Sequence, residues 1–307
     1  MKLAVIILNW NGKNDTLACL ESLKPQGTEI IVVDNGSTDD SIAAIREKFP
    51  DITLIPTGKN LGYAGGNNVG IEYALEKGAD AILLLNNDTI PDRHFISALT
   101  TAAENSPEIG IFGAYPCHFS DPDKLDHLGG IWNHKTASFD LIGLGAPRGF
   151  RADSPLDYVC GCSILIRSAV FKAIGLLEPK FFLFWEEADF CWRARKAGFG
   201  IQVCYEAQLL HKVSASFTGG TPQKTYFWWR GRLLWIERNC SPQEKRLLYK
   251  TVIKPKLRHL MKLRILKTLQ LFLRKNPQNQ NKLLQYRAAL TAYRDFSKGN
   301  FSNIAQK

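Results

Sequence analysis

Acidic side chains in three parts of the chain have the sequence surroundings of groups that do chemistry. Glu186 and Glu187 follow five apolar or aromatic residues in the stretch FFLFWEEADF. A carboxylate beside apolar walls has a raised pKa and becomes a usable general base. Adjacent acids on a helix point in different directions, so at most one of the two is expected to face a substrate. The alternative is an acid that only favours the positive end of a helix.

Asp88 and Asp34 each come at the end of an apolar segment. Asp88 closes LLLNND, where a carboxylate would meet solvent just past a strand. A hard divalent cation takes oxygen ligands and shares them with phosphates, so one carboxylate and a diphosphate could form a metal site. Asp34 ends IIVVD and could bind a nucleobase or ribose. Helix capping by Asp88 and turn formation by Asp34 within NGSTD are the alternatives.

Two further segments could contribute to binding. The loop NLGYAGGNN (60–68) would let the backbone approach a diphosphate closely. It does not match GxGxxG and no P-loop lysine follows it, which weighs against dehydrogenases and NTPases. His211 follows two leucines. A lone histidine is usually structural, and only its position after the acids makes His211 a candidate.

Alternating strands and helices must position these groups. The apolar runs predict strands at 4–8, 29–34, 51–55 and 80–88, separated by helices, one capped by Ser37 or Thr38 and another opening at Pro91. This order predicts an α/β fold with a largely parallel sheet and helices on both faces. Ligands then bind beyond the carboxyl ends of the strands. Three polar clusters lie at those ends: Asn9 and Asn11; Asp34 and Asn35; and Asn86, Asn87 and Asp88.

The rest of the body is less regular. Residues 115–157 predict long loops with a possible short hairpin, 157–175 a strand and a helix, 186–199 a helix, and 201–205 a late strand. The seven cysteines have no CxxC spacing and are expected to be reduced, buried thiols. No run of eighteen apolar residues occurs, and the apolar N-terminus lacks a cleavage site, so we read it as the first strand of a cytosolic protein.

Charge divides the chain into a body, expected at 1–240, and a basic extension, expected at 241–307. Residues 1–240 hold 23 Lys and Arg against 27 Asp and Glu, whereas residues 241–275 hold 11 against one. Such asymmetry indicates an anionic partner, either a membrane surface or nucleic acid. An apolar stripe among basic residues predicts a helix that lies flat on a membrane, although it could instead pack on the body. The stripe comprises Leu257, Leu260, Met261, Ile265, Leu269, Phe272 and Leu273.

Two neighbouring features complete this expectation. Pro255 should separate the stripe from an earlier helix. Trp228, Trp229 and Trp235 lie just upstream, and indole rings favour the membrane interface.

Taken together, the motifs resemble the family 2 glycosyltransferases with the GT-A fold, and within them the bacterial rhamnosyltransferase-like enzymes that build cell-surface polysaccharides. The matching motifs span roughly residues 3–238: ILNWNG, VVDNGSTD, NLGYAGGNN, LLLNNDT, FFLFWEEADFCWRARKAGF and the His211 region. The resemblance implies a nucleotide-sugar donor, a divalent metal (Mn or Mg) and inversion at the anomeric carbon.

The resemblance also implies roles for individual residues. Asp34 would bind the nucleoside, and Asp88 would be the metal-binding last residue of the DXD element, with Asn86 where the first Asp often stands. Glu187 falls at the catalytic acid, and His211 where some members have a further metal ligand. Asn9, Asn11, Asn35, Asn60, Gly65 and Gly66 would join Asp34 and Asn86 around the donor. Gly161, Cys162, Trp185 and Glu186 would lie on the acceptor side.

Other classes of protein explain less. A nucleotidyltransferase needs a basic phosphate loop near the first strand, where only Lys13 stands. A nucleic-acid-binding protein would explain the basic tail but not the acidic body, and a catalytically dead scaffold would normally have lost Asp88 or Glu187. We expect rhamnose from a dTDP-linked donor first, then UDP-linked hexoses or galactofuranose. The acceptor would be a saccharide or lipid-linked, at the inner face of the cell membrane, with no nucleic-acid partner.

Overall fold

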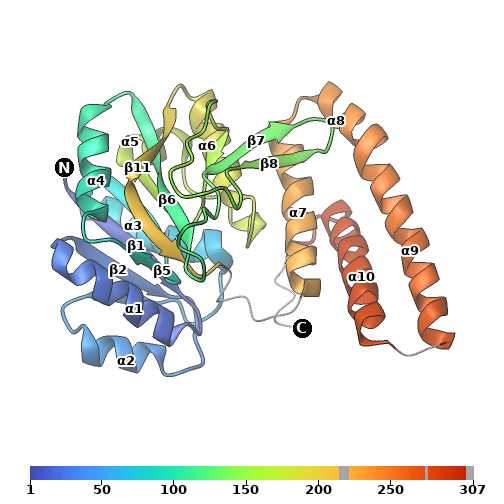
Figure 1. Ribbon diagram of the computed structural model, residues 1–307, viewed down its shortest axis with the longest axis horizontal. Helices are drawn as coiled ribbons and strands as arrows, with labels where there is room; N and C mark the ends of the chain where they lie inside the picture. The colour runs from blue at the N-terminus through green and yellow to red at the C-terminus, as the bar shows by residue number, and fades with distance from the viewer. Residues whose placement is uncertain (214–220, 274–275, 302–307) are drawn as a thin grey trace. The chain divides into compact units, whose positions relative to one another are not determined.

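The computed structural model describes residues 1–213, 221–273 and 276–301 (Figure 1). Its central feature is an eight-stranded sheet in the order β3-β2-β1-β4-β10-β6-β11-β5. The strands are β1 (Leu3–Asn9), β2 (Glu29–Asp34), β3 (Thr53–Pro56), β4 (Ala81–Asn86), β5 (Thr89–Pro91), β6 (Ile109–His118), β10 (Ser163–Arg167) and β11 (Gly200–His211).

The sheet is largely parallel, as expected. β3, β2, β1 and β4 run parallel to one another, and β6 runs parallel to β11. β10 is antiparallel to β4 and β6, and the short β5 is antiparallel to β11. In register, Asn9 pairs with Asp34, and Leu8 pairs with Asn86. The carboxyl ends of β1, β2 and β4 therefore meet at one edge, where the polar clusters were expected.

Helices cover both faces of the sheet, because alternate strand residues point to opposite sides. On one face, Val5 and Ile7 of β1 belong to a buried cluster with residues of α1, α2 and α4. On the other, α3 approaches so closely that a Cβ on Gly70 would lie 2.7 Å from Ile6 Cγ2. The helices of this part are α1 (Lys13–Leu23), α2 (Ser41–Lys48), α3 (Gly62–Glu76), α4 (Phe95–Asn105), α5 (Ser168–Ile174) and α6 (Glu186–Lys196).

Two expected helix starts are wrong. Pro91 lies in β5, and α4 begins four residues later at Phe95, since the chain first pairs with β11. α2 begins at Ser41 with Asp40 at its N-cap position. Ser37 and Thr38 do not cap it because they bond elsewhere: the Ser37 hydroxyl accepts from the Asn11 amide, and the Thr38 amide donates to the Asn11 side chain.

The irregular middle contains more strand than its sequence predicts. β6 extends to His118, and the possible hairpin is present as β7 (Gly129–Asn133) and β8 (Ser138–Ile142), which join β9 (Tyr158–Val159) in a three-stranded sheet. β11 continues to His211, well past the expected end at residue 205. Six cysteines are free and buried, as expected: Cys19, Cys117, Cys160, Cys162, Cys191 and Cys204.

The chain forms two compact units. One comprises 1–131, 140–179 and 187–216, and the other comprises 132–139, 180–186 and 217–307. In this division α7 groups with the helices that follow it, and the expected ranges 1–240 and 241–307 stay a prediction. The helical unit contains α7 (Thr221–Asn239), α8 (Pro242–Leu248), α9 (Lys254–Leu273) and α10 (Pro277–Ser297). Figure 1 shows α9 and α10 side by side, and the two helices are in contact.

The expected interfacial tryptophans instead form part of this unit's core. Trp235 is fully buried, with its ring centroid 4.1 Å from that of Trp132, and Trp229 is only 8% exposed. Trp228 is half-buried against Trp185. Their indole rings therefore contribute to packing inside the unit.

Pro255 is accommodated without a break in the helical backbone. A π-helical turn at Tyr249–Ile253 lies between α8 and α9, and Pro255 follows it as the second residue of α9. Because proline lacks an N–H and its ring crowds the preceding turn, the wider turn is where such a residue fits. No helix in the described ranges has the length and apolar character that crossing a membrane requires.

The contact between α3 and the sheet generates a stability prediction. Gly70→Ala adds a methyl group against the fully buried side chains of Ile6 and Val33. Alanine's higher helix propensity favours the variant by about 1 kcal/mol, whereas overpacking in a rigid core costs about 1–3 kcal/mol. We expect a net loss in the free energy of unfolding, measured by urea denaturation. A variant more stable than wild type would show that helix propensity prevails.

Candidate functional site

Asp34 is a buried acceptor at the carboxyl end of β2. Asn9 Nδ2 donates to its Oδ2 at 2.7 Å, and the Ser37 backbone amide donates to its Oδ1 at 2.9 Å. Both Asn9 and Asp34 are fully buried. The turn interaction with Ser37 was the structural alternative for Asp34, and it is present. Binding of a nucleoside by Asp34 stays a prediction.

The other amides at this edge join its loops. Asn35 Nδ2 donates to Asn60 Oδ1 and to the Gly62 carbonyl, while its Oδ1 accepts from the Leu61 amide. Asn11 adopts a positive φ of 50°, and its side chain accepts from Thr38. These residues therefore hold the segments after β1, β2 and β3 together, which gives any ligand at this edge a rigid surface.

Gly65 and Gly66 lie in the first turns of α3, where Gly66 has a packing role. A Cβ at Gly66 would come within 2.5 Å of Leu8 Cδ1 and 3.2 Å of Asn35 Cγ. Glycine at 66 thus lets the helix approach β1. The expected approach of this backbone to a diphosphate stays a prediction.

Asp88 lies against His211 because of a strand that the sequence did not predict. β5 follows Asp88 and pairs with the end of β11, with Thr89 opposite His211. As a result, Asp88 Oδ1 is 3.3 Å from His211 Nε2, and both residues are less than 10% exposed. Asn86, two residues earlier at the end of β4, has a buried Oδ1 that accepts no hydrogen bond from the described residues.

Asp126 is a site residue that the sequence analysis missed. Its Oδ2 lies 2.8 Å from His211 Nδ1, and its Oδ1 lies 3.1 Å from His127 Nδ1. The segment that carries Asp126 has weak periodicity and no motif, so only its acid–histidine dipeptide could have drawn attention. In the structure, the Asp126 amide donates to the Pro116 carbonyl, which anchors it beside β6.

The row Asp88–His211–Asp126 favours positive charge at its centre. Burial alone would lower the pKa of His211, but the two carboxylates outweigh it and raise that pKa to about 10. Burial likewise opposes ionisation of Asp126, yet its hydrogen bonds with His127 and His211 hold its pKa well below the ordinary range. Two carboxylates stabilise a cation between or beside them.

The same residues fit a divalent metal. His211 Nε2 is buried and makes no hydrogen bond of good geometry within the described part of the chain, although it faces Asp88. Carboxylate oxygen with one imidazole nitrogen is a donor set that Mn²⁺ or Mg²⁺ accepts, with phosphate oxygens completing the coordination.

Glu187 stands in the first turn of α6 with the properties of a base. The residue is half-buried, but its Oε2 is shielded from solvent and accepts no hydrogen bond from the residues described. Burial raises the pKa of Glu187 from 4.5 to about 7. A Cβ on Gly161 would lie 3.2 Å from Glu187 Cγ, so the small residue at 161 makes room for this side chain.

The backbone is strained just before α6. Phe182, Phe184 and Trp185 have φ values of 65°, 67° and 76°, a region that non-glycine residues rarely adopt. Each such residue costs of order 1 kcal/mol or more and persists only where surrounding packing enforces it. Strain of this kind clusters at functional sites, which fits the position of Glu187 immediately after it.

The remaining residues expected on the acceptor side are mostly buried. Cys162, Trp185 and Glu186 are 3%, 6% and 4% exposed, whereas Gly161 is half-buried. Cys160 Sγ lies 3.5 Å from Cys162 Sγ and 3.7 Å from His127 Nδ1. Contact of these residues with an acceptor stays a prediction.

Comparison with known proteins identifies the family of this chain. Residues 4–175 match the family described as Glycosyl transferase family 2. The low-salt glycan biosynthesis hexosyltransferase Agl10 of Haloferax volcanii is 30% identical, over 81% of this chain and 80% of its own. The N-acetylglucosaminyl-diphospho-decaprenol L-rhamnosyltransferase of Mycobacterium tuberculosis is 26% identical, over 80% of this chain and 92% of its own.

A solved structure shares the fold. The mannosyltransferase PcManGT from Pyrobaculum calidifontis, in complex with GDP-Man and Mn²⁺, aligns with a TM-score of 0.57 at 13% identity, over 96% of this chain and 87% of its own. The expected GT-A-like architecture, with a largely parallel sheet and C-terminal helices, is thereby confirmed. With its sequence match covering more than half of its length, the chain belongs to glycosyl transferase family 2.

Proposed function

We propose that this protein is an inverting, metal-dependent hexosyltransferase that moves a sugar from a nucleoside-diphosphate donor to a hydroxyl of a saccharide or lipid-linked acceptor. The observation that carries the proposal is Glu187, which has a solvent-shielded, unpartnered oxygen among the described residues and a pKa of about 7. Inversion in one displacement needs one such base, and a buried carboxylate titrating near neutral pH suits it.

Each site residue has a proposed role. Glu187 takes the proton from the acceptor hydroxyl as its oxygen attacks the anomeric carbon. Asp34, Asn35 and Asn86 contact the nucleoside and ribose at the sheet edge. Asp88 and His211 would hold a divalent ion, which would supply positive charge for the leaving diphosphate. Asp126 keeps the His211 ring oriented through Nδ1.

Rhamnose is the first candidate sugar, with a dTDP- or UDP-linked donor. One relative is named a rhamnosyltransferase and another a hexosyltransferase, which supports a six-carbon sugar without choosing among them. Screening donors by release of the nucleoside diphosphate tests this choice. Release of pyrophosphate from a nucleoside triphosphate would instead favour the nucleotidyltransferase alternative.

Glu187→Gln should remove the base and keep the shape of the side chain. We expect turnover to fall by about 10²–10⁴, with donor affinity unchanged. In the wild-type enzyme, kcat/KM should fall about tenfold per pH unit below pH 7, because the carboxylate becomes protonated there. Steady-state kinetics at pH 5.5–8.5 measure both effects. An inactive Glu186→Gln beside an active Glu187→Gln would contradict the assignment.

The same variant has a stability readout. The folded-state pKa of Glu187 is raised, so ionising it disfavours the fold at pH values above its unfolded-state pKa. Glu187→Gln should therefore be more stable than wild type by about 3 kcal/mol at pH 8, and the gain should vanish near pH 4. Urea denaturation at the two pH values measures this difference and shows that the inactive variant is folded.

Metal removal tests Asp88 and His211. Activity should vanish in EDTA and return with Mn²⁺ or Mg²⁺. Asp88→Asn should lose most Mn²⁺ affinity, whereas His211→Ala should weaken it less because the diphosphate keeps its oxygens. Isothermal titration with Mn²⁺ and donor measures the affinities, and exposed His94→Ala is the control. Full activity after exhaustive chelation would exclude the metal role.

An anionic membrane is the proposed docking surface of α9. Met261, Ile265, Leu266 and Leu269 are 49–57% exposed, whereas Leu257 is buried. The expected stripe is thus exposed over most of its described length; the side chains of Phe272 and Leu273 lie outside the description. Exposed basic residues lie between these apolar ones, among them Arg258, Lys262 and Arg264. Each basic residue near an anionic surface contributes about 1 kcal/mol.

Flotation of the full chain with anionic vesicles tests this surface. Wild type should float at low salt and less at high salt. The double variant Ile265→Ser/Leu269→Ser should lose most flotation, whereas Leu247→Ser, equally exposed on α8, should not. Absence of wild-type flotation, or no effect of the double variant, would rule out docking through α9.

A further inference from the structure

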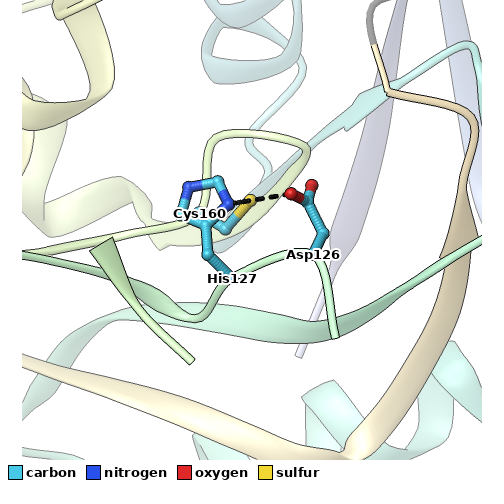
Figure 2. A group of neighbouring side chains, drawn as sticks. All are labelled: Asp126, His127 and Cys160. Carbon is cyan, nitrogen blue, oxygen red and sulfur yellow. Dashed lines mark hydrogen bonds and ion pairs between the residues drawn. The ribbon is translucent and has the colours of Figure 1, made fainter. Parts of the chain in front are cut away.

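Three metal-ligating side chains converge beside the candidate site. Figure 2 shows Asp126, His127 and Cys160 pointing toward one another, and one donor atom from each lies within 4.8 Å of the other two. Asp126 and Cys160 are 5% and 3% exposed, and the His127 side chain is 18% exposed. The Cys160 amide donates to the Leu128 carbonyl at 3.0 Å, which fixes the two segments next to each other.

The geometry does not suit a cysteine–histidine–aspartate nucleophile. In such a relay, the carboxylate binds one ring nitrogen and the thiol faces the other. Here Asp126 Oδ1 and Cys160 Sγ both face His127 Nδ1, at 3.1 and 3.7 Å. When an oxygen and a sulfur both face the same nitrogen, the three atoms are arranged as ligands around one metal ion would be.

The separations are close to those of a tetrahedral zinc site. With Zn–N, Zn–O and Zn–S bonds of about 2.0–2.3 Å, neighbouring ligand atoms lie about 3.3 Å apart for oxygen and nitrogen and about 3.6 Å for nitrogen and sulfur. The observed values are 3.1 and 3.7 Å. A second thiol, Cys162 Sγ, lies 3.5 Å from Cys160 Sγ but is not a member of the group of donor atoms that all lie within 4.8 Å of one another.

We propose that Asp126, His127 and Cys160 bind a thiophilic divalent cation such as Zn²⁺. Thiolate and imidazole ligands select zinc and similar metals, whereas Mg²⁺ and Mn²⁺ favour oxygen. The site is therefore chemically distinct from the pair Asp88 and His211. An ion here ties the segment before β7 to the segment between β9 and β10, which carries Gly161.

Cobalt spectroscopy of the full-length protein tests the site without using activity. Reduced, metal-free protein is titrated with Co²⁺. We expect a thiolate-to-cobalt charge-transfer band in the near ultraviolet that saturates with one equivalent at this site, with Zn²⁺ abolishing the band in competition. Cys160→Ser should remove the band, and His127→Gln should weaken Co²⁺ binding at least tenfold. The control Cys191→Ser, another buried thiol, should keep the band.

Two measurements keep the outcome clear. Asp88→Asn should retain the thiolate band while losing Mn²⁺ affinity, so failure of this site and failure of the proposed catalytic metal are distinguishable. In wild type, Zn²⁺ should protect Cys160 from alkylation, measured by mass spectrometry, which needs no variant that could misfold. A wild-type protein without the band, or Cys160 alkylated equally with and without Zn²⁺, would overturn the proposal.

Discussion

One imidazole, that of His211, is held between two buried carboxylates, and several segments take their positions from this row. Asp88 follows β4, Asp126 follows β6, and His211 ends β11, so the ion pairs link three strands of the central sheet. Removing one partner from such a row leaves an uncompensated buried charge, at a cost of about 3–5 kcal/mol. The row therefore constrains the fold as strongly as it shapes the chemistry.

A second constraint acts on Glu187. Glu187 follows Phe182, Phe184 and Trp185, which are in left-handed conformation, and it lies against Gly161, where a Cβ would come 3.2 Å from Glu187 Cγ. Both features work against stability: the backbone is strained, and the shielded carboxylate is costly to ionise. Proteins retain such arrangements where the geometry of a functional group matters more than the free energy of folding.

Much of this architecture could be predicted because local sequence patterns specify it. The apolar runs before Asn9, Asp34 and Asn86 identified the strands, and parallel pairing brings their ends together. Asp126 could not be predicted, since its partner His211 is 85 residues away and nothing local marks the contact. β5 was missed for a similar reason: its three residues are held by pairing with β11 rather than by their own propensity. The tryptophans of α7 were expected at a membrane interface but pack inside the protein. Their sequence could not decide between the two, because indole rings suit a membrane interface and a protein core equally well.

The carboxylate of Asp126 is shared by two histidines, so an interaction at one histidine affects the other. With one oxygen facing His127 and the other facing His211, a single negative charge serves two imidazole rings. A cation that binds on one side of Asp126 therefore changes the binding free energy of a cation on the other side. By thermodynamic reciprocity the effect must be equal in both directions. Were cations to bind beside Cys160 and beside Asp88, as proposed, the two occupancies would therefore be coupled and measurable as one linkage constant.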